Sequence, residues 1–432
     1  MCHVLSPFPD RTGYIGLQPP LHASRNFTMT RSFSLLLLLL FALSAGAERH
    51  GIDQVVLDGA AKELKTQVAK GNIIGAAYMV YRNGKVVQFN VVGASDVESK
   101  TPLKSDSIMR IYSMSKPITS VAAMTLWEKG KFKLDDPVSK FIKSFKHTKV
   151  LVTTGGKSSI VPAKRQLTVR DVFRHTTGYS YGDGKIEPYY KKVGMRYLAP
   201  KGMFPPKMTI LEAADVLANI PALHQPGAKF TYGFNTDLLG RLIEVWSGQT
   251  LDKYMASTVF TPLEMVDTGF VVPAGKRNRF TTCHTREGKK IIAVDKAASS
   301  PFTRGFKFLS GGGGLVSTMK DYGRFCQMMV SDGRYKSRQI LRAGTFKLMF
   351  SDQLAKNGKR GRFRFGLGFA IRDVEIRGGK KVKAYYWGGY ANTGFEIVPA
   401  TGVYQVFMRQ LVPSTHKVSK ALFKMVNKEV SP

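Results

Sequence analysis

The alternation of apolar and polar residues predicts a helix and then a β-hairpin in the first part of the chain. Apolar residues recur every three or four positions from Ile52 to Val68, which is typical of an amphipathic helix. Two β-rich runs follow at 73–81 and 86–92, with Arg82-Asn83-Gly84 between them. Asn-Gly between two such runs is one of the strongest short-range signals for a hairpin.

The remaining pattern divides into a helical centre and a strand-rich last third. From about 117 to 297, helical stretches alternate with loops rich in Pro and Gly. Strand signals return at 364–375, 383–387, 393–399 and 403–409, and a helix is expected from about 415 to 430. Strands at both ends with helices between them predict an α+β fold, an α/β sandwich. We expect one antiparallel sheet, formed from both termini and flanked by helices, with a mostly helical lobe inserted.

The domain boundaries follow from this pattern and from the length of 432 residues, which favours a large two-lobed domain. We expect one domain at 48–432. Its α/β lobe would comprise about 48–116 and 298–432, and its helical lobe about 117–297.

The N-terminal segment predicts export. Met29-Thr30-Arg31 precedes a run of six leucines, Leu35–Leu40, and Ala45-Gly46-Ala47 follows as a small-residue cleavage site. This order indicates a secretory signal peptide at 29–47, with 1–28 as an upstream extension. The alternative is a retained anchor, although the apolar run is short for a membrane span. We therefore expect a periplasmic or secreted protein.

Composition adds a strong basic character. The chain has 65 Lys and Arg against 30 Asp and Glu, a net charge of +35, and its basic residues are spread along the chain. No recognition helix or arm is evident, so no specific nucleic acid partner is predicted. Non-specific contact with an anionic wall polymer or polysaccharide is one interpretation, and a basic surface without a specific partner is the other. No oligomeric state is predicted.

Cysteine, histidine and acidic residues do not suggest a cofactor. After the predicted signal only Cys283 and Cys326 remain, and two cysteines so far apart are expected to be buried free thiols. No group of His, Cys, Asp and Glu has the spacing of metal ligands, so neither a metal nor another cofactor is expected.

Three Ser-x-x-Lys patterns offer a candidate nucleophile, at Ser113/Lys116, Ser317/Lys320 and Ser414/Lys417. Only the first opens a convincing helix: Pro117 stands in the first turn, where its missing N–H costs nothing, and apolar residues follow at helical spacing. Three residues make about one helical turn, which brings the Lys116 ammonium beside the Ser113 hydroxyl. A buried lysine there can accept the serine proton.

This pair belongs to the first of several longer segments, which follow one another along the chain. They are Ile111-Tyr112-Ser113-Met114-Ser115-Lys116, Leu134-Asp135-Asp136-Pro137-Val138, Thr168 to Gly178, Pro226-Gly227 with Phe230-Thr231-Tyr232, Leu238 to Glu244, Gly312 to Thr318, Phe365 to Phe369, and Trp387-Gly388-Gly389. From about residue 52 to the C-terminus the chain thus resembles the serine β-lactamase and penicillin-binding-protein superfamily. It is most similar in motif to class C β-lactamases and family VIII carboxylesterases.

The resemblance implies that Tyr232 is a second catalytic residue, which relays a proton to or from the leaving group. A phenol does this only when a neighbouring cation favours its ionised form, and Lys116 is the candidate cation. Class C enzymes usually carry Asn two residues after this Tyr. Here Phe234 holds that place and Asn235 follows it, so whether Asn235 reaches the site stays open.

The third family element is usually Lys-Thr-Gly on an edge strand, and here Trp387-Gly388-Gly389 stands in its place. Loss of the lysine removes a recognition group for the carboxylate of β-lactams and D-Ala-D-Ala ends. An apolar Trp favours neutral acyl groups, so we assign 387–389 to substrate binding. The glycines allow the backbone to approach substrate, so that the N–H groups of Ser113 and Tyr390 could form an oxyanion hole.

Two further motifs are interpreted as structural. His175 in His-Thr-Thr-Gly suggests a Ser-His pair, but the resemblance assigns this segment to a turn after a helix. The run Gly311–Gly314 lacks the Lys-Ser/Thr of a phosphate-binding loop and is expected to let a loop pass close to the site.

The sequence therefore predicts an exported serine hydrolase that acts through an acyl-enzyme, a carboxylesterase on small neutral esters. One alternative keeps the fold and takes β-lactams or stem peptides, as a β-lactamase or a D-Ala-D-Ala carboxypeptidase. Another is a non-catalytic basic protein that binds anionic cell-wall polymer.

Overall fold

A computed structural model describes residues 48–49, 51–195, 208–354 and 363–432. The predicted upstream extension and signal peptide lie outside the described residues. So does 196–207 within the loop that follows Tyr179.

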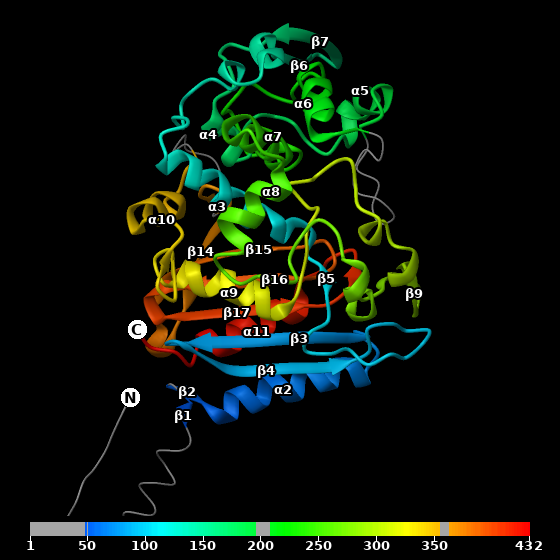
Figure 1. Cartoon of the computed structure of the whole chain (residues 1–432), viewed down its shortest axis with the longest axis vertical. Coiled ribbons are helices and arrows are strands. Elements are labelled where there is room, and N and C mark those ends of the chain that lie inside the picture. Colours follow the sequence, from blue (N-terminus) through cyan, green and yellow to red (C-terminus); the bar gives the residue numbers. More distant parts are fainter. Residues whose placement is uncertain (1–47, 50, 196–207, 355–362) are drawn as a thin grey trace, which may run out of the picture. The chain divides into compact units, whose positions relative to one another are not determined.

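A seven-stranded antiparallel sheet combines strands from both ends of the chain (Figure 1). Its order is β13-β14-β15-β16-β17-β3-β4. The strands are β3 (Gly75–Arg82), β4 (Lys85–Gly93), β13 (Arg364–Phe365), β14 (Ala370–Glu375), β15 (Lys381–Gly388), β16 (Gly394–Val398) and β17 (Val403–Met408). The two ends of the chain meet where β17 pairs with β3, with Tyr404 opposite Tyr81. The predicted hairpin and the predicted α+β fold are confirmed.

Helices cover both faces of this sheet (Figure 1). On one face α2 (Gln54–Ala69) and α11 (Lys417–Asn427) bury an apolar cluster that includes Leu64, Tyr78 and Leu422. On the other face lie α9 (Met319–Val330) and α3 (Ser115–Glu128), which join the larger core. Burial of these apolar faces is the main force that holds the helices on the sheet.

The centre of the chain contains more β structure than the sequence predicted. Its helices are α4 (Val169–Phe173), α5 (Glu187–Lys192), α6 (Ile210–Ala218), α7 (Asn235–Ser247) and α8 (Leu251–Met255). Two hairpins accompany them: β6 (Lys149–Thr154) with β7 (Lys157–Pro162), and β8 (Cys283–Glu287) with β9 (Lys290–Asp295). We expected a mostly helical lobe at 117–297, and these two hairpins are β structure that the sequence pattern did not indicate. The first hairpin turns at Gly155-Gly156, where both residues have the positive φ that a tight turn needs. The lobe boundary at 117 and 297 stays a prediction.

Short elements complete the fold. They are β1 (Glu48–Arg49), β2 (Ile52–Asp53), β5 (Met109–Arg110) paired with β10 (Val316–Ser317), β11 (Arg334–Tyr335) paired with β12 (Arg338–Gln339), β18 (Leu411–Val412) beside β8, and α10 (Ala343–Phe350).

β15, which carries Trp387, is not an edge strand, in contrast to the family pattern. It lies between β14 and β16, because β13 and β14 extend the sheet outside it. The pairing with β14 stops at Tyr386, so Trp387 and Gly388 project past the end of that strand. This last part of β15 is therefore open on the β14 side.

Cys283 and Cys326 are buried free thiols, which confirms that prediction. Among the residues that the structure describes, no group of three His, Cys, Asp or Glu side chains is placed to hold a metal ion. No helix in the described ranges is both long and apolar enough to cross a membrane.

Candidate active site

Ser113 lies in a single 3-10 turn, Tyr112–Met114, directly before α3. Tyr112 has φ of +43°, an uncommon conformation for a large side chain, and the buried backbone around it maintains this turn. From α9, the Tyr322 hydroxyl donates to the Met114 carbonyl at 3.0 Å. Every residue of α3 from Ser115 to Leu126 is buried, so packing fixes the position of the serine.

Lys116 follows one turn later and is 1% exposed. Its Nζ lies 3.3 Å from the Ser113 Oγ, 2.6 Å from the Gly312 carbonyl oxygen and 2.9 Å from the Tyr181 hydroxyl. The structure thus brings the predicted serine and lysine together. Each of the three donor hydrogens of the ammonium has a partner.

The other two Ser-x-x-Lys patterns do not form such pairs. Ser317 lies in β10, and its Oγ is 2.8 Å from the Thr268 hydroxyl. Ser414 lies in the loop before α11. Within the described residues, neither serine bonds to the lysine three positions later, which agrees with the choice of Ser113.

Tyr232 reaches the same serine from the segment before α7. Its hydroxyl donates to the Ser113 Oγ at 2.6 Å, and its ring centroid lies 4.6 Å from the Lys116 Nζ. The ring packs against Tyr181 and Trp387, both with centroids 5.5 Å away. The serine hydroxyl therefore contacts both of its predicted partners.

Tyr181 is a site residue that sequence reasoning missed. Its hydroxyl accepts the hydrogen bond from Lys116, and its ring lies edge-on to Phe234 at 4.9 Å. The residue stands in the loop that follows Tyr179. No motif marks it as a partner of the lysine, and only the folded chain brings the two together.

Asn235 does not line the pocket. Its Oδ1 accepts from the Thr177 hydroxyl at 2.5 Å, and its Nδ2 donates to the carbonyls of Tyr179 and Thr231, each at 3.2 Å. It therefore braces the segment that carries Tyr232 against the segment that leads to Tyr181, and the question left open by its shifted position is answered.

His175 lies in a turn directly after α4, as the resemblance implied, with φ of +57°. Its ring is buried and packs against Tyr232 at 5.2 Å and Phe365 at 5.6 Å. Burial, together with the charge of Lys116, holds the pKa of His175 well below its usual range. A neutral imidazole behind Tyr232 supports the phenol ring, and no bond joins it to Ser113.

Trp387, Gly388, Gly389 and Tyr390 line one wall of the pocket that contains Ser113. A Cβ on Gly389 would collide with the Ile111 carbonyl oxygen, two residues before the serine, and with the Thr393 hydroxyl. Glycine is therefore required for the end of β15 to approach the backbone that carries the nucleophile.

The pocket itself has a volume of about 570 Å³. Its walls are mainly aromatic near Ser113 and more polar at α11. The lining residues are Ser113, Tyr181, Phe230, Tyr232, Phe363, Arg372, Tyr386, Trp387, Gly388, Gly389, Tyr390, Gly394, Phe395, Ser414, His416, Ser419, Lys420 and Phe423. Such a cavity accommodates a small organic molecule with its reacting group at the serine.

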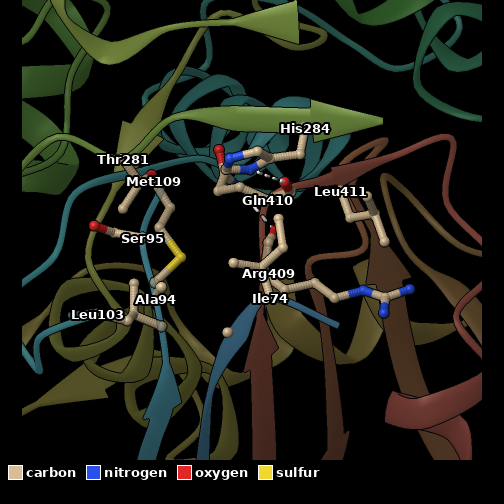
Figure 2. A pocket seen from close by; sticks show the side chains of 11 residues that line it. Ile74, Ala94, Ser95, Leu103, Met109, Thr281, His284, Arg409, Gln410 and Leu411 are labelled. Carbon is tan, nitrogen blue, oxygen red and sulfur yellow. Dashed lines mark hydrogen bonds between the residues drawn. The ribbon is translucent and has the colours of Figure 1, made fainter. Parts of the chain in front are cut away.

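A second hollow, shown in Figure 2, lies elsewhere, between Met109, His284 and Gln410. It measures only about 10 Å³, which is space for one water molecule. The Gln410 side chain accepts from the Arg110 N–H at 3.1 Å and donates to its carbonyl at 3.0 Å, so this region braces the strand that leads to Ser113.

The chain is similar in sequence and in fold to several known proteins. A family model described as Beta-lactamase matches residues 60–424. An uncharacterised protein of Mycobacterium tuberculosis is 29% identical over 375 residues, 83% of this chain and 90% of that protein. Esterase EstB of Burkholderia gladioli is 27% identical over 301 residues, 65% of this chain and 70% of the esterase. The solved structure of EstCE1, a hydrolase with promiscuous acyltransferase activity, superimposes with a TM-score of 0.71 at 22% identity, covering 86% of this chain and 98% of that one.

Proposed function

Because this chain belongs to the Beta-lactamase family, we propose that it is a serine hydrolase that cleaves carboxylic esters through an acyl-enzyme on Ser113. One observation carries the proposal: the Ser113 Oγ lies within hydrogen-bond distance of both the Lys116 Nζ, at 3.3 Å, and the Tyr232 hydroxyl, at 2.6 Å. A nucleophile with two proton-handling neighbours is the arrangement that acyl transfer requires. A protein that only binds ligands needs none of it.

In the acylation step the Ser113 Oγ attacks the ester carbonyl carbon. Its proton passes to Lys116, which must be in the neutral amine form to accept it; Tyr232 delivers a proton to the oxygen of the departing alcohol and recovers one from Lys116. The N–H groups of Ser113 and Tyr390 are proposed to donate to the oxyanion of the tetrahedral intermediate. Water then attacks the acyl-enzyme, the acid departs and the serine recovers its proton.

The substrate class is inferred from the pocket wall that carries Trp387. Trp387 replaces the usual lysine, and its ring forms an aromatic surface with Tyr232 and with Phe365, whose centroid is 5.3 Å away. Such a surface favours neutral acyl groups. EstB is named an esterase, which supports an ester substrate.

A second reaction of the same intermediate is transfer of the acyl group to an alcohol instead of water. A pocket of about 570 Å³ has space for an acceptor beside a small acyl group. The acyltransferase activity named for EstCE1 supports this alternative. Formation of a new ester between the acyl group and an added alcohol would identify it.

The test compares the wild-type chain with Ser113→Ala on p-nitrophenyl butyrate and on nitrocefin. We expect serine-dependent ester cleavage and little nitrocefin turnover. Ser317→Ala is the matched control, because it changes another buried Ser-x-x-Lys serine and should retain activity. Undiminished ester cleavage by Ser113→Ala would refute the proposal, and faster nitrocefin turnover would favour the β-lactamase alternative. No turnover of either substrate would favour a D-Ala-D-Ala carboxypeptidase or a binding protein. A fluorophosphonate probe would then separate these two, because only the carboxypeptidase would be labelled at Ser113.

We also propose that the protein is exported by its segment at 29–47 and cleaved after Ala47. N-terminal sequencing of the mature protein from its native host would test this, and a chain that retains 29–47 would contradict it. Weak, salt-sensitive contact with anionic wall polymer is proposed from the net charge of +35. Such binding should decrease steeply as ionic strength rises.

A further inference from the structure

Asp237 is a buried carboxyl group next to the proposed active site that the mechanism above does not use. It lies in the first turn of α7, five residues after Tyr232, and is 4% exposed. Its Oδ1 accepts hydrogen bonds from the Gly312 N–H, at 3.0 Å, and from the Ser310 hydroxyl. Its Oδ2 is buried and has no hydrogen-bond partner among the residues that the structure describes. Burying a carboxyl group with one oxygen unpaired costs free energy, so its position beside the site needs a physical explanation.

The reason suggested by the geometry is the loop between Asp237 and Lys116. The Gly312 N–H points to the Asp237 carboxyl, while the Gly312 carbonyl accepts the 2.6 Å hydrogen bond from the Lys116 Nζ. A Cβ on Gly312 would lie 2.7 Å from the Asp237 Oδ2, so only glycine allows this approach. The carboxyl and the lysine therefore hold opposite sides of one residue.

Charge adds a second link. Within the described residues Lys116 forms no salt bridge, and its three hydrogen bonds go to neutral oxygens. Burial raises the pKa of Asp237, and the positive charge of Lys116 opposes that effect. The two groups thus interact electrostatically across the loop, in surroundings where water screens little.

We propose that Asp237 is a positioning residue for Lys116: its carboxyl fixes the Gly312 residue whose carbonyl orients the ammonium. This inference rests on the proposed function, because it assigns Lys116 as the base for Ser113.

Among the residues that the structure describes, the other groups that face Lys116 are hydroxyls and one imidazole. They are the hydroxyls of Ser113, Tyr181 and Tyr232 and the neutral imidazole of His175. The loop contributes Gly312 and Ser310. Asp237 contributes the carboxyl group to this set of described residues. Its replacement by an amide should therefore change the pH dependence of Ser113 labelling.

The experiment measures the rate at which a fluorophosphonate probe labels Ser113, as a function of pH. Asp237→Asn keeps the shape of the side chain and an oxygen that can accept from Gly312, but removes the charge. Because the neutral amine of Lys116 then forms more easily, the pH of half-maximal labelling should fall by about one unit. The plateau rate should also decrease, since a weaker base accepts the serine proton less readily.

Asp321→Asn is the matched control. Asp321 is also a buried aspartate in the first turn of a helix, but its carboxyl bonds to Thr268 and the Asp267 N–H, outside the pocket. That variant should keep the wild-type midpoint. Ser310→Ala serves as a second test if Asp237→Asn does not fold. It removes a hydrogen bond that favours the ionised carboxyl, and should lower the midpoint by less than one unit.

A lower midpoint in Asp237→Asn, with an unchanged midpoint in Asp321→Asn, would support the proposal. A wild-type midpoint in Asp237→Asn, or in Ser310→Ala where only that variant folds, would overturn it, because a purely structural role lowers the plateau alone. Labelling that persists in Ser113→Ala would instead refute the proposed function, and the inference with it.

Discussion

The Tyr232 hydroxyl donates a 2.6 Å hydrogen bond to the Ser113 Oγ although 119 positions separate the two residues in the chain. The segment between them contains the helices α3 to α6 and the β6–β7 hairpin. Tyr232 precedes α7 and Ser113 precedes α3, and these two helices pack against each other in the core. The active-site geometry is thus a consequence of helix packing.

Tyr232→Phe should lower kcat/KM for p-nitrophenyl butyrate about 100-fold or more, since positioned proton transfer contributes at least that much. The ring contacts with His175 and Trp387 remain, so the fold should be retained. Steady-state kinetics with thermal unfolding as a check would measure both. Tyr386→Phe is the control, because that phenol lines the same pocket without a bond to the serine. Equal effects of the two substitutions would argue against a special role for Tyr232.

Tyr181→Phe should reduce kcat/KM about ten- to a hundredfold. It removes the hydroxyl that accepts from Lys116 at 2.9 Å, and a hydrogen bond to a charged group contributes about 1.5–3 kcal/mol. The effect should be on kcat more than on KM, because the hydroxyl holds the base. An unchanged kcat would show that the other two partners of Lys116 suffice to orient it.

The parts of the site that depend on local spacing could be predicted from the sequence. Ser113 and Lys116 are one helical turn apart, and the β3–β4 hairpin follows from Asn-Gly between two apolar runs. Tyr232 required the family resemblance, because nothing in its own surroundings distinguishes it from a packing residue.

Tyr181 and Asp237 could not be predicted, because their partners are remote. Tyr181 meets Lys116 across 65 positions, and Asp237 meets Gly312 across 75. No local pattern encodes these contacts, which arise from the packing of α3, α7 and the glycine loop. The expectation that Gly311–Gly314 lets a loop pass close to the site is confirmed, but the carboxyl behind it was not foreseen.

Gly389→Ala should destabilise the protein by about 1–3 kcal/mol and impair labelling of Ser113. The added methyl group collides with the Ile111 carbonyl and the Thr393 hydroxyl, and must displace the backbone beside the nucleophile. Gly344→Ala in α10 is the matched control, because its Cβ meets no heavy atom within 4 Å. Chemical denaturation would measure stability. Equal stability and equal Ser113 labelling of Gly389→Ala and Gly344→Ala would contradict the close approach of the end of β15 to Ile111.

Asp267→Asn should show a pH-dependent loss of stability. The Arg279 guanidinium lies 2.5 Å from the Asp267 carboxylate, and this hydrogen bond, with help from Lys276, lowers the pKa of Asp267 to about 2 from 3.8. A lowered pKa contributes stability that is fully present above about pH 4 and is lost as the pH falls through about 2. With allowance for solvent screening, the contribution is about 1 kcal/mol.

Urea denaturation tests this contribution. The free energies of unfolding of the wild type and of Asp267→Asn should differ by this amount at pH 7 and converge as the pH falls from 4 towards 2. Asp58→Asn on the exposed side of α2 should match the wild type throughout, and a constant difference for Asp267→Asn at every pH would show that the ion pair is not its cause.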